Sequence, residues 1–114
     1  MAATDHAVVV VTTSTETEDQ ARALAAAVVR ERLAACAQIH PIQSLFRWEG
    51  TVRESPEWRV DLKTRADLAD RLTAFVAEHH DYDVPEIIVV PVVGGGPAYL
   101  GWVAAETVPG EASV

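Results

Sequence analysis

The fold is decided by the stretch FRWEGTVRESPEWRVDLK, residues 46–63, in which two extended segments flank the pair Glu49-Gly50. Glycine tolerates the positive φ angle that a tight hairpin turn demands. After the turn, apolar and charged side chains alternate, which is typical of a strand with one buried face. The apolar positions are Val52, Trp58, Val60 and Leu62, and the charged positions are Arg53, Arg59, Asp61 and Lys63. The stretch therefore predicts a β-hairpin. Pro56 places the first part of the return strand on an edge or at a bulge, because proline donates no ladder hydrogen bond.

The segments before the hairpin predict a strand, a helix and a second strand. Residues 7–11 form a continuous apolar run that is typical of a buried strand. Thr15 and Glu18 fit a capping box, which predicts a helix that runs to about Leu33. Residues 36–48 are extended, with Pro41 interrupting the ladder. The apolar face of the predicted helix contains Ala21, Leu24, Ala25, Val28 and Val29.

The segments after the hairpin predict a helix, a strand and a short final helix. Thr64 and Asp67 repeat the capping pattern, and the helix that they open is expected to end near His80. Residues 86–93 form a nearly unbroken apolar strand, and the three glycines at 94–96 break the chain. Pro97 suits the first turn of the last helix, and the residues beyond Thr107 are expected to form a loose tail.

The resulting order, β-α-β-β-α-β, is typical of the α+β ferredoxin-like fold, in which one antiparallel sheet carries both helices on one face. We expect a single domain over residues 1–114, with an ordered core from about residue 7 to residue 107. The other face of such a sheet meets water, yet the first and last predicted strands are apolar on both faces. Large apolar patches mark interfaces, and most soluble oligomers contain identical chains. The sequence therefore predicts a homo-oligomer without fixing the number of its subunits.

Composition excludes several functions. The 17 acidic and 9 basic residues give a formal net charge of -8, which repels phosphate backbones and anionic membrane surfaces. We therefore expect neither a nucleic-acid nor a membrane partner. The first residues contain neither a basic segment nor a long apolar run, which predicts a cytoplasmic protein. The single cysteine, Cys36, agrees with a reducing compartment.

Four ordered motifs stand out along the chain: RLAACAQIHPIQSLFRWEG at residues 32–50, LKTR at 62–65, HHDYDVPEII at 79–88 and GPAYLGWV at 96–103. Together they resemble the CutA1 divalent-cation tolerance family. Their spacing is compatible with the family, and the resemblance extends from about Val8 to Thr107. It implies a cytoplasmic protein with a ferredoxin-like fold that assembles as a homotrimer through its sheets.

The resemblance also implies a function and candidate ligands. The family is linked to tolerance of copper and other divalent metals and can bind copper(II), which predicts a protein that is not an enzyme and needs no obligatory cofactor. Its trimer is similar to that of the PII signalling proteins, so the alternative is a trimer that binds a small molecule at its subunit clefts. Carried over residue by residue, the metal candidates are Cys36 of AAC, His80 and Glu86 of PEI. Asp81 departs from the proline that often follows this histidine in the family, which changes the stiffness of the loop.

Residue chemistry alone leaves two interpretations of each candidate. Imidazole and carboxylate suit copper or zinc, but the helix dipole also favours a histidine such as His79 or His80 at a helix C-terminus. Cys36 opens an apolar strand, where a buried thiol is the simpler interpretation. Large aromatic side chains can line a cleft, but they are more often core or interface anchors. The aromatic candidates are Trp48, Trp58, Tyr99 and Trp102.

Enzymes and nucleotide sites on the same scaffold are disfavoured. An acylphosphatase-like hydrolase needs an arginine-bearing, glycine-rich anion loop, but residues 11–19 at the first strand-helix junction are acidic and contain no arginine. The three glycines at 94–96 belong to neither a Walker pattern nor a GxGxxG motif. We therefore expect them to form a turn.

Overall fold

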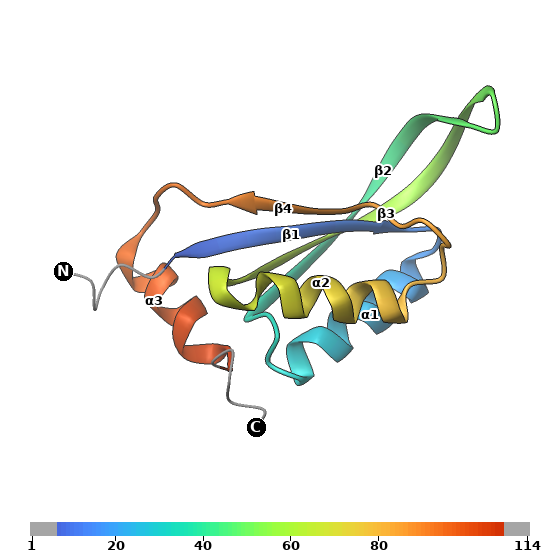
Figure 1. Cartoon of the computed structure of the whole chain (residues 1–114). Coiled ribbons are helices and arrows are strands. Elements are labelled where there is room, and N and C mark those ends of the chain that lie inside the picture. The colour runs from blue at the N-terminus through green and yellow to red at the C-terminus, as the bar shows by residue number, and fades with distance from the viewer. Residues whose placement is uncertain (1–6, 109–114) are drawn as a thin grey trace.

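The computed structural model describes residues 7–108 and contains one four-stranded antiparallel sheet with strand order β2-β3-β1-β4. Helices α1 and α2 cover one face of the sheet (Figure 1). The elements are β1 (Val8–Thr15), α1 (Glu18–Arg30), β2 (Cys36–Trp48), β3 (Thr51–Arg65), the 3₁₀ turn η2 (Ala66–Leu68), α2 (Ala69–His79), β4 (Ile87–Pro91) and α3 (Pro97–Glu106). The order confirms the predicted ferredoxin-like fold with a short C-terminal helix.

The core lies between the sheet and the α1–α2 layer. In β1, Val11 pairs with Leu62 of β3 on one side and with Val89 of β4 on the other. Alternation therefore directs one side-chain face of every strand toward the helices. Leu62, Val60 and Val11 are completely buried there, against Leu72 and other apolar residues of the two helices.

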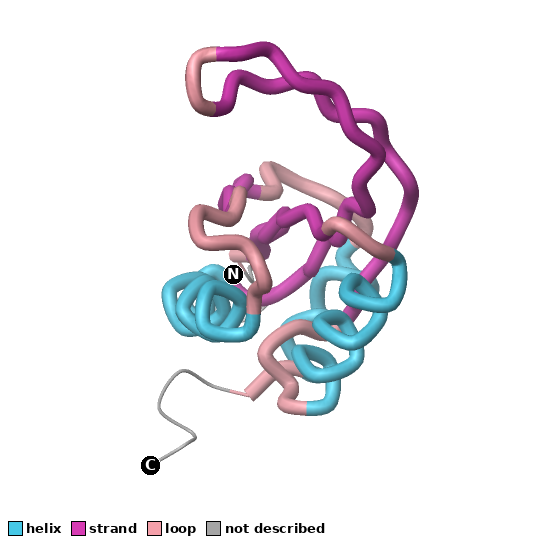
Figure 2. The backbone as a smooth tube through the Cα atoms, turned by 90° about the vertical axis from the view of Figure 1, so that its right-hand side faces the viewer, coloured by secondary structure: helices cyan, strands magenta, loops and turns pink. Residues whose placement is uncertain are grey.

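The β2–β3 hairpin extends beyond the other two strands of the sheet. Strand β3 pairs with β1 only from Trp58 onward, whereas its first half pairs with β2 alone. We call residues 42–57 the arm. Figure 2 shows the arm curving away from the two helices beyond the end of the sheet. Pro56 lies in this half, where β3 has a strand partner on one side only, so its predicted edge position is confirmed.

The predicted start of the first helix is wrong by two residues. Strand β1 continues through Thr15 because Thr13 and Thr15 are buried opposite Val60 and Trp58. The capping box is formed by Thr17 and Gln20, whose side chains bond each other's backbone N–H groups. The helix ends at Arg30 rather than near Leu33, since Arg32 adopts a left-handed conformation with φ 60°.

The predicted cap of the second helix is also wrong. The Thr64 hydroxyl donates to the Leu33 carbonyl oxygen at 2.7 Å, and Asp67 forms an ion pair with Arg65. Helix α2 has no side-chain cap and begins after η2 instead. Its end at His79, with His80 as the C-cap, agrees with the prediction.

The last strand is shorter than predicted, and its apolar side chains are exposed. Strand β4 covers five residues rather than 86–93, although the Val92 N–H still donates to the Val8 carbonyl oxygen. Ile88, Val89 and Val90 of this edge strand are all exposed. Apart from Val108, the predicted tail beyond Thr107 lies outside the described residues, as do the first six residues.

Helix α3 closes the end of the sheet at which β1 begins (Figure 1). Its start at Pro97 agrees with the prediction. The Arg32 guanidinium donates to the carbonyl oxygens of Ala105 and Glu106, which fixes the C-terminal end of α3 beside the end of α1. Within residues 7–108, no helix is both long and apolar enough to span a membrane.

Candidate functional site

A cavity of about 480 Å³ lies between the arm and the segment that joins α2 to β4. We call residues 80–86 the connector and this cavity the arm cleft. The cleft is lined by Ser14, Gln43, Ser44, Leu45, Phe46, Glu57, Tyr82, Val84 and Glu86. Two carboxylates, Glu57 of β3 and Glu86 at the end of the connector, thus line the same cavity, which makes it an acidic site.

His80 lies beside the arm cleft with both ring nitrogens engaged. Its Nε2 is 2.8 Å from the Ser14 carbonyl oxygen, and its Nδ1 accepts a hydrogen bond from the Tyr82 N–H at 3.0 Å. A carbonyl oxygen only accepts, so Nε2 carries the proton and Nδ1 holds the lone pair. His80 therefore fixes the start of the connector to the end of β1, and a metal at Nδ1 would have to displace the Tyr82 N–H.

His79 has the alternative role considered for the histidine pair. Its Nδ1 is 2.8 Å from the Phe75 carbonyl oxygen, and its ring stacks on the Phe75 ring with centroids 4.0 Å apart. Because that carbonyl lies near the end of α2, the His79 ring interacts with the C-terminal end of its own helix.

Tyr82 joins the connector to the arm. Its hydroxyl donates to Glu57 Oε2 at 2.7 Å, and its ring lies against the His80 ring with centroids 4.9 Å apart. Burial, followed by the hydrogen bond to Glu57 and the charge of that carboxylate, raises the pKa of the Tyr82 phenol. The phenol is therefore held in its protonated, donating form. Neither Tyr82 nor Glu57 is among the residues predicted from the sequence, and the only signal for them is the tyrosine within the HHDYDVPEII motif.

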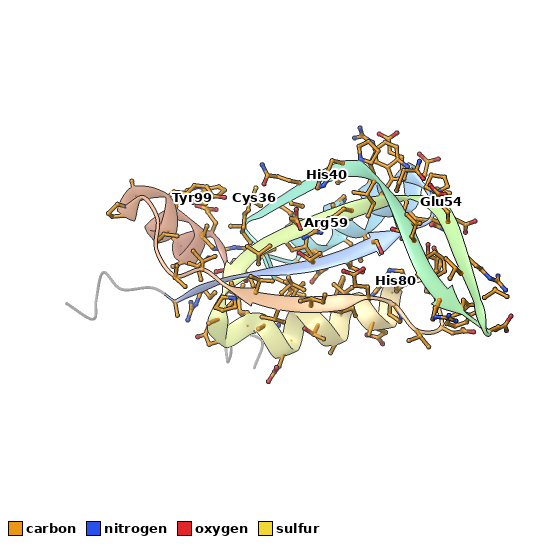
Figure 3. The ribbon with its side chains drawn as sticks, turned by 90° about the horizontal axis from the view of Figure 1, so that it is seen from above. Cys36, His40, Glu54, Arg59, His80 and Tyr99 are labelled. Atoms are coloured by element: carbon orange, nitrogen blue, oxygen red, sulfur yellow. The ribbon has the colours of Figure 1, made fainter. Side chains whose placement is uncertain are left out.

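Cys36 lies at the opposite end of the sheet from His80. Figure 3 shows Cys36 beside Tyr99 at the α3 end, and His80 toward the arm. Cys36 is partly buried in the single subunit and is not one of the residues of the core cluster, so the interpretation as a buried core thiol is not confirmed. Burial, with a further contribution from the Cys36 thiol, raises the pKa of the Tyr99 phenol.

The three proposed metal ligands therefore do not converge within one chain. Glu86 lines the arm cleft, His80 borders it, and Cys36 is remote from both. Among residues 7–108, no group of three or more histidine, cysteine, aspartate or glutamate side chains is placed to hold a metal ion.

The aromatic candidates divide into two environments. Trp58 is partly buried and packs against the core cluster. Trp48, Tyr99 and Trp102 are exposed, so the core interpretation is wrong for these three, and their interface or cleft role stays a prediction. Tyr99 and Trp102 lie together on α3 with ring centroids 5.6 Å apart.

The open face of the sheet carries a polar network that the charge alternation did not reveal. Thr12 Oγ1 and Arg59 Nε both donate to Asp61 Oδ1, at 2.8 and 3.1 Å. Burial alone raises the pKa of the Asp61 carboxyl, but the bonds from Thr12 and Arg59 and the electrostatic interactions with Arg59 and His40 lower that pKa below its ordinary value. Figure 3 shows His40 and Arg59 close together over this face. The carboxylate is therefore kept ionised.

Comparisons with known proteins agree with this architecture. The family model described as CutA1 divalent ion tolerance protein matches residues 8–106. The chain is 39% identical over 99 residues to the divalent-cation tolerance protein CutA of Thermus thermophilus, covering 86% of this chain and 96% of that one. The crystal structure of CutA1 from Oryza sativa superimposes with a TM-score of 0.88 at 39% identity, covering 92% of this chain and 97% of that one.

Some relatives are longer than this chain and are named as chloroplastic proteins. The chain is 40% identical over 100 residues to the chloroplastic protein CutA of Arabidopsis thaliana, which covers 87% of this chain but only 55% of the plant protein. The chain thus spans about half the length of that relative. Because the match to the family model covers nearly all described residues, this chain belongs to the CutA1 divalent ion tolerance protein family.

Proposed function

We propose that this chain is a non-enzymatic, cytoplasmic divalent-cation tolerance protein that assembles as a homotrimer and binds copper(II) through His80 and Glu86. The observation that carries the proposal is the arm cleft, in which Glu57 and Glu86 line one cavity beside His80. Membership of a divalent ion tolerance family supports the choice of a metal. Imidazole and carboxylate ligands suit copper(II).

The hydrogen bonds of His80 set the strength of this binding. A neutral imidazole has one lone pair, which already accepts the Tyr82 N–H, so copper(II) competes with that bond. One subunit supplies only two of the proposed ligands, and water or a neighbouring subunit completes the sphere. We therefore expect weak to moderate affinity, and we assign no metal role to Cys36 alongside His80.

Calorimetric titration with copper(II) tests the site. His80→Ala and the isosteric Glu86→Gln should each weaken binding, whereas His79→Ala is the matched control because its ring serves the α2 C-terminus. If both cleft variants bind copper(II) as tightly as the wild type does, the proposed site is wrong.

The exposed apolar side chains support the homotrimer. Leu45 and Val52 of the arm are 68% and 65% exposed, and β4 is exposed over most of its length. Such surfaces are typical of subunit interfaces. Sedimentation at low micromolar concentration should give three times the chain mass, and a stable monomer would overturn this part of the proposal.

A small-molecule-binding trimer is the second candidate. The arm cleft has the volume of an ordinary ligand pocket, which is about 300–1,000 Å³. Its two carboxylates repel nucleotides and other anions, which distinguishes the expected ligand from those of a nucleotide sensor. A cationic or neutral ligand is favoured.

A further inference from the structure

A second cavity, of about 340 Å³, lies at the tip of the arm and is separate from the proposed copper ligands. It is lined by Trp48 of the arm and by Asp81, Tyr82, Asp83 and Val84 of the connector. We call it the aromatic pocket. Two aromatic residues from segments far apart in the sequence and two acidic residues thus line the same pocket.

The hairpin turn fixes the position of Trp48, which forms one wall of the pocket. Glu49 and Gly50 both have positive φ angles, 51° and 82°, which is the signature of a tight hairpin connection. The Thr51 hydroxyl donates to the Trp48 carbonyl oxygen at 3.1 Å. The turn therefore fixes the backbone from which the indole projects.

Three contacts fix the position of Tyr82, which forms another wall of the pocket. The Tyr82 N–H donates to His80, its hydroxyl donates to Glu57, and its ring lies against the His80 ring. A side chain with these contacts loses little freedom when a ligand binds, which favours affinity.

The carboxylates of the aromatic pocket are available to a ligand. Within the part of the chain that the structure describes, the ion pairs between side chains involve neither Asp81 nor Asp83. Arg53, a cation near the tip, is paired with Glu49. The pocket therefore combines uncompensated negative charge with aromatic rings.

We propose that the aromatic pocket binds a small quaternary ammonium ion. Tryptophan and tyrosine rings attract a cation over their faces, and they favour a weakly hydrated organic cation. A hydrated divalent metal gains more from oxygen ligands than from rings. The proposal goes beyond the second candidate function, because it names a class of small molecule and places it in a cavity other than the arm cleft.

This pocket is compatible with the proposed assembly. Along β2, Trp48 lies on the same strand face as Phe46, whereas Leu45 lies on the opposite face. The register places Val52 opposite Arg47, on the face of Leu45. The subunit contact proposed for Leu45 and Val52 therefore uses the face that does not carry Trp48.

Choline chloride is the probe, and 3,3-dimethyl-1-butanol is its neutral control of the same shape. We expect saturable binding of choline to the full chain by calorimetry and by tryptophan fluorescence, and at least tenfold weaker binding of the alcohol. Trp48→Leu should weaken choline binding about tenfold, while Trp48→Phe, which keeps an aromatic face, should lose less. Asp83→Asn should weaken it severalfold without altering either ring.

The outcomes separate this proposal from copper binding and from a lipid source. Sedimentation of each variant identifies any loss of assembly, and Asp83→Asn tests the pocket even if Trp48→Leu fails to assemble. Equal binding of choline and the alcohol, wild-type affinity in both Trp48→Leu and Asp83→Asn, or binding to phosphatidylcholine vesicles but not to free choline would each overturn the proposal. Copper(II) titration of the same samples tests the other site, because Trp48 and Asp83 line the aromatic pocket but not the arm cleft, so failure of one site is distinguishable from failure of the other.

Discussion

The two halves of strand β3 have similar residue patterns but opposite environments. In the body of the sheet, Val60 and Leu62 are completely buried beneath α1 and α2. In the arm, Val52 occupies the same strand face and is 65% exposed. The paired strand β2 shows the same contrast. Ile39, opposite Val60, packs against the core, whereas Leu45 in the arm is 68% exposed.

The contrast shows that an apolar face produces a core only where a second layer covers it. The helices α1 and α2 end before the arm, so the arm's apolar residues have no cover from their own chain on that face. Burial of such side chains is worth about 1.5–3 kcal/mol each, which is available to a partner subunit. The body therefore stabilises the subunit, while the arm is available for assembly and ligand binding.

The largest effect is expected from truncation in the body. Leu72→Ala removes a fully buried side chain of α2 and should lower the free energy of unfolding by about 2–5 kcal/mol. Leu45→Ala in the arm should cost the separated subunit less than about 0.5 kcal/mol. Urea unfolding at two protein concentrations checks both, because only the effect of Leu45→Ala should grow with assembly. An equally large loss in dilute Leu45→Ala would show that the arm packs on its own subunit.

A charge on the arm should act on assembly rather than on folding. Val52→Asp places a carboxylate on the exposed apolar face and should weaken trimer formation by about 2 kcal/mol or more, as at an interface hot spot. Sedimentation on dilution measures this change. Ala77→Asp on the exposed side of α2 is the control with the same added charge. Identical dissociation of the Val52→Asp variant and the wild type would remove the arm from the interface.

The polar network of the body gives a smaller, pH-dependent effect. Asp61→Asn removes the charged acceptor of Thr12 and Arg59 and should lower the free energy of unfolding at pH 7 by about 1–2 kcal/mol. A carboxyl whose folded-state pKa is lowered stabilises the fold above its ordinary pKa of about 3.9, and this contribution is lost as the pH falls through the folded value.

Urea unfolding of wild type and Asp61→Asn at pH 7, 5 and 3 checks this sign. The difference between the two proteins should be full at pH 7 and should shrink at pH 3, and Glu78→Gln on an exposed helix surface should show little difference at any pH. A difference that does not depend on pH would mean that the carboxylate charge is not what stabilises the network.

The smallest effect distinguishes the two helix starts. Thr17→Ala removes the N-cap of α1 and should cost about 1 kcal/mol of stability. Asp67→Ala, at the uncapped start of the second helix, should cost less than half of that, since its exposed pair with Arg65 is weak. Thermal unfolding of the two variants measures both, and equal losses would contradict the assignment of the cap.

Local sequence signals determined the fold class. The turn at Glu49-Gly50, the alternation from Trp58 to Lys63 and the apolar stripe of α1 each depend on neighbours along the chain, and all three are in the structure. The errors arose where a distant partner competed with a local rule. Thr15 resembles a cap, but burial against Trp58 extends β1 through it, and Thr64 is taken by the Leu33 carbonyl oxygen.

The sequence by itself determined the order of the elements, because hydrophobic period and turn chemistry act over a few residues. Only the tertiary structure decided the candidate sites. It separated Cys36 from His80, engaged both nitrogens of His80, and brought Tyr82 to Glu57 and Trp48 to Asp83. Except for the bond from the Tyr82 N–H to His80, these contacts join residues that are distant in the sequence. Those of Glu57 and Trp48 depend on the curvature of the arm over the connector, which no local pattern encodes.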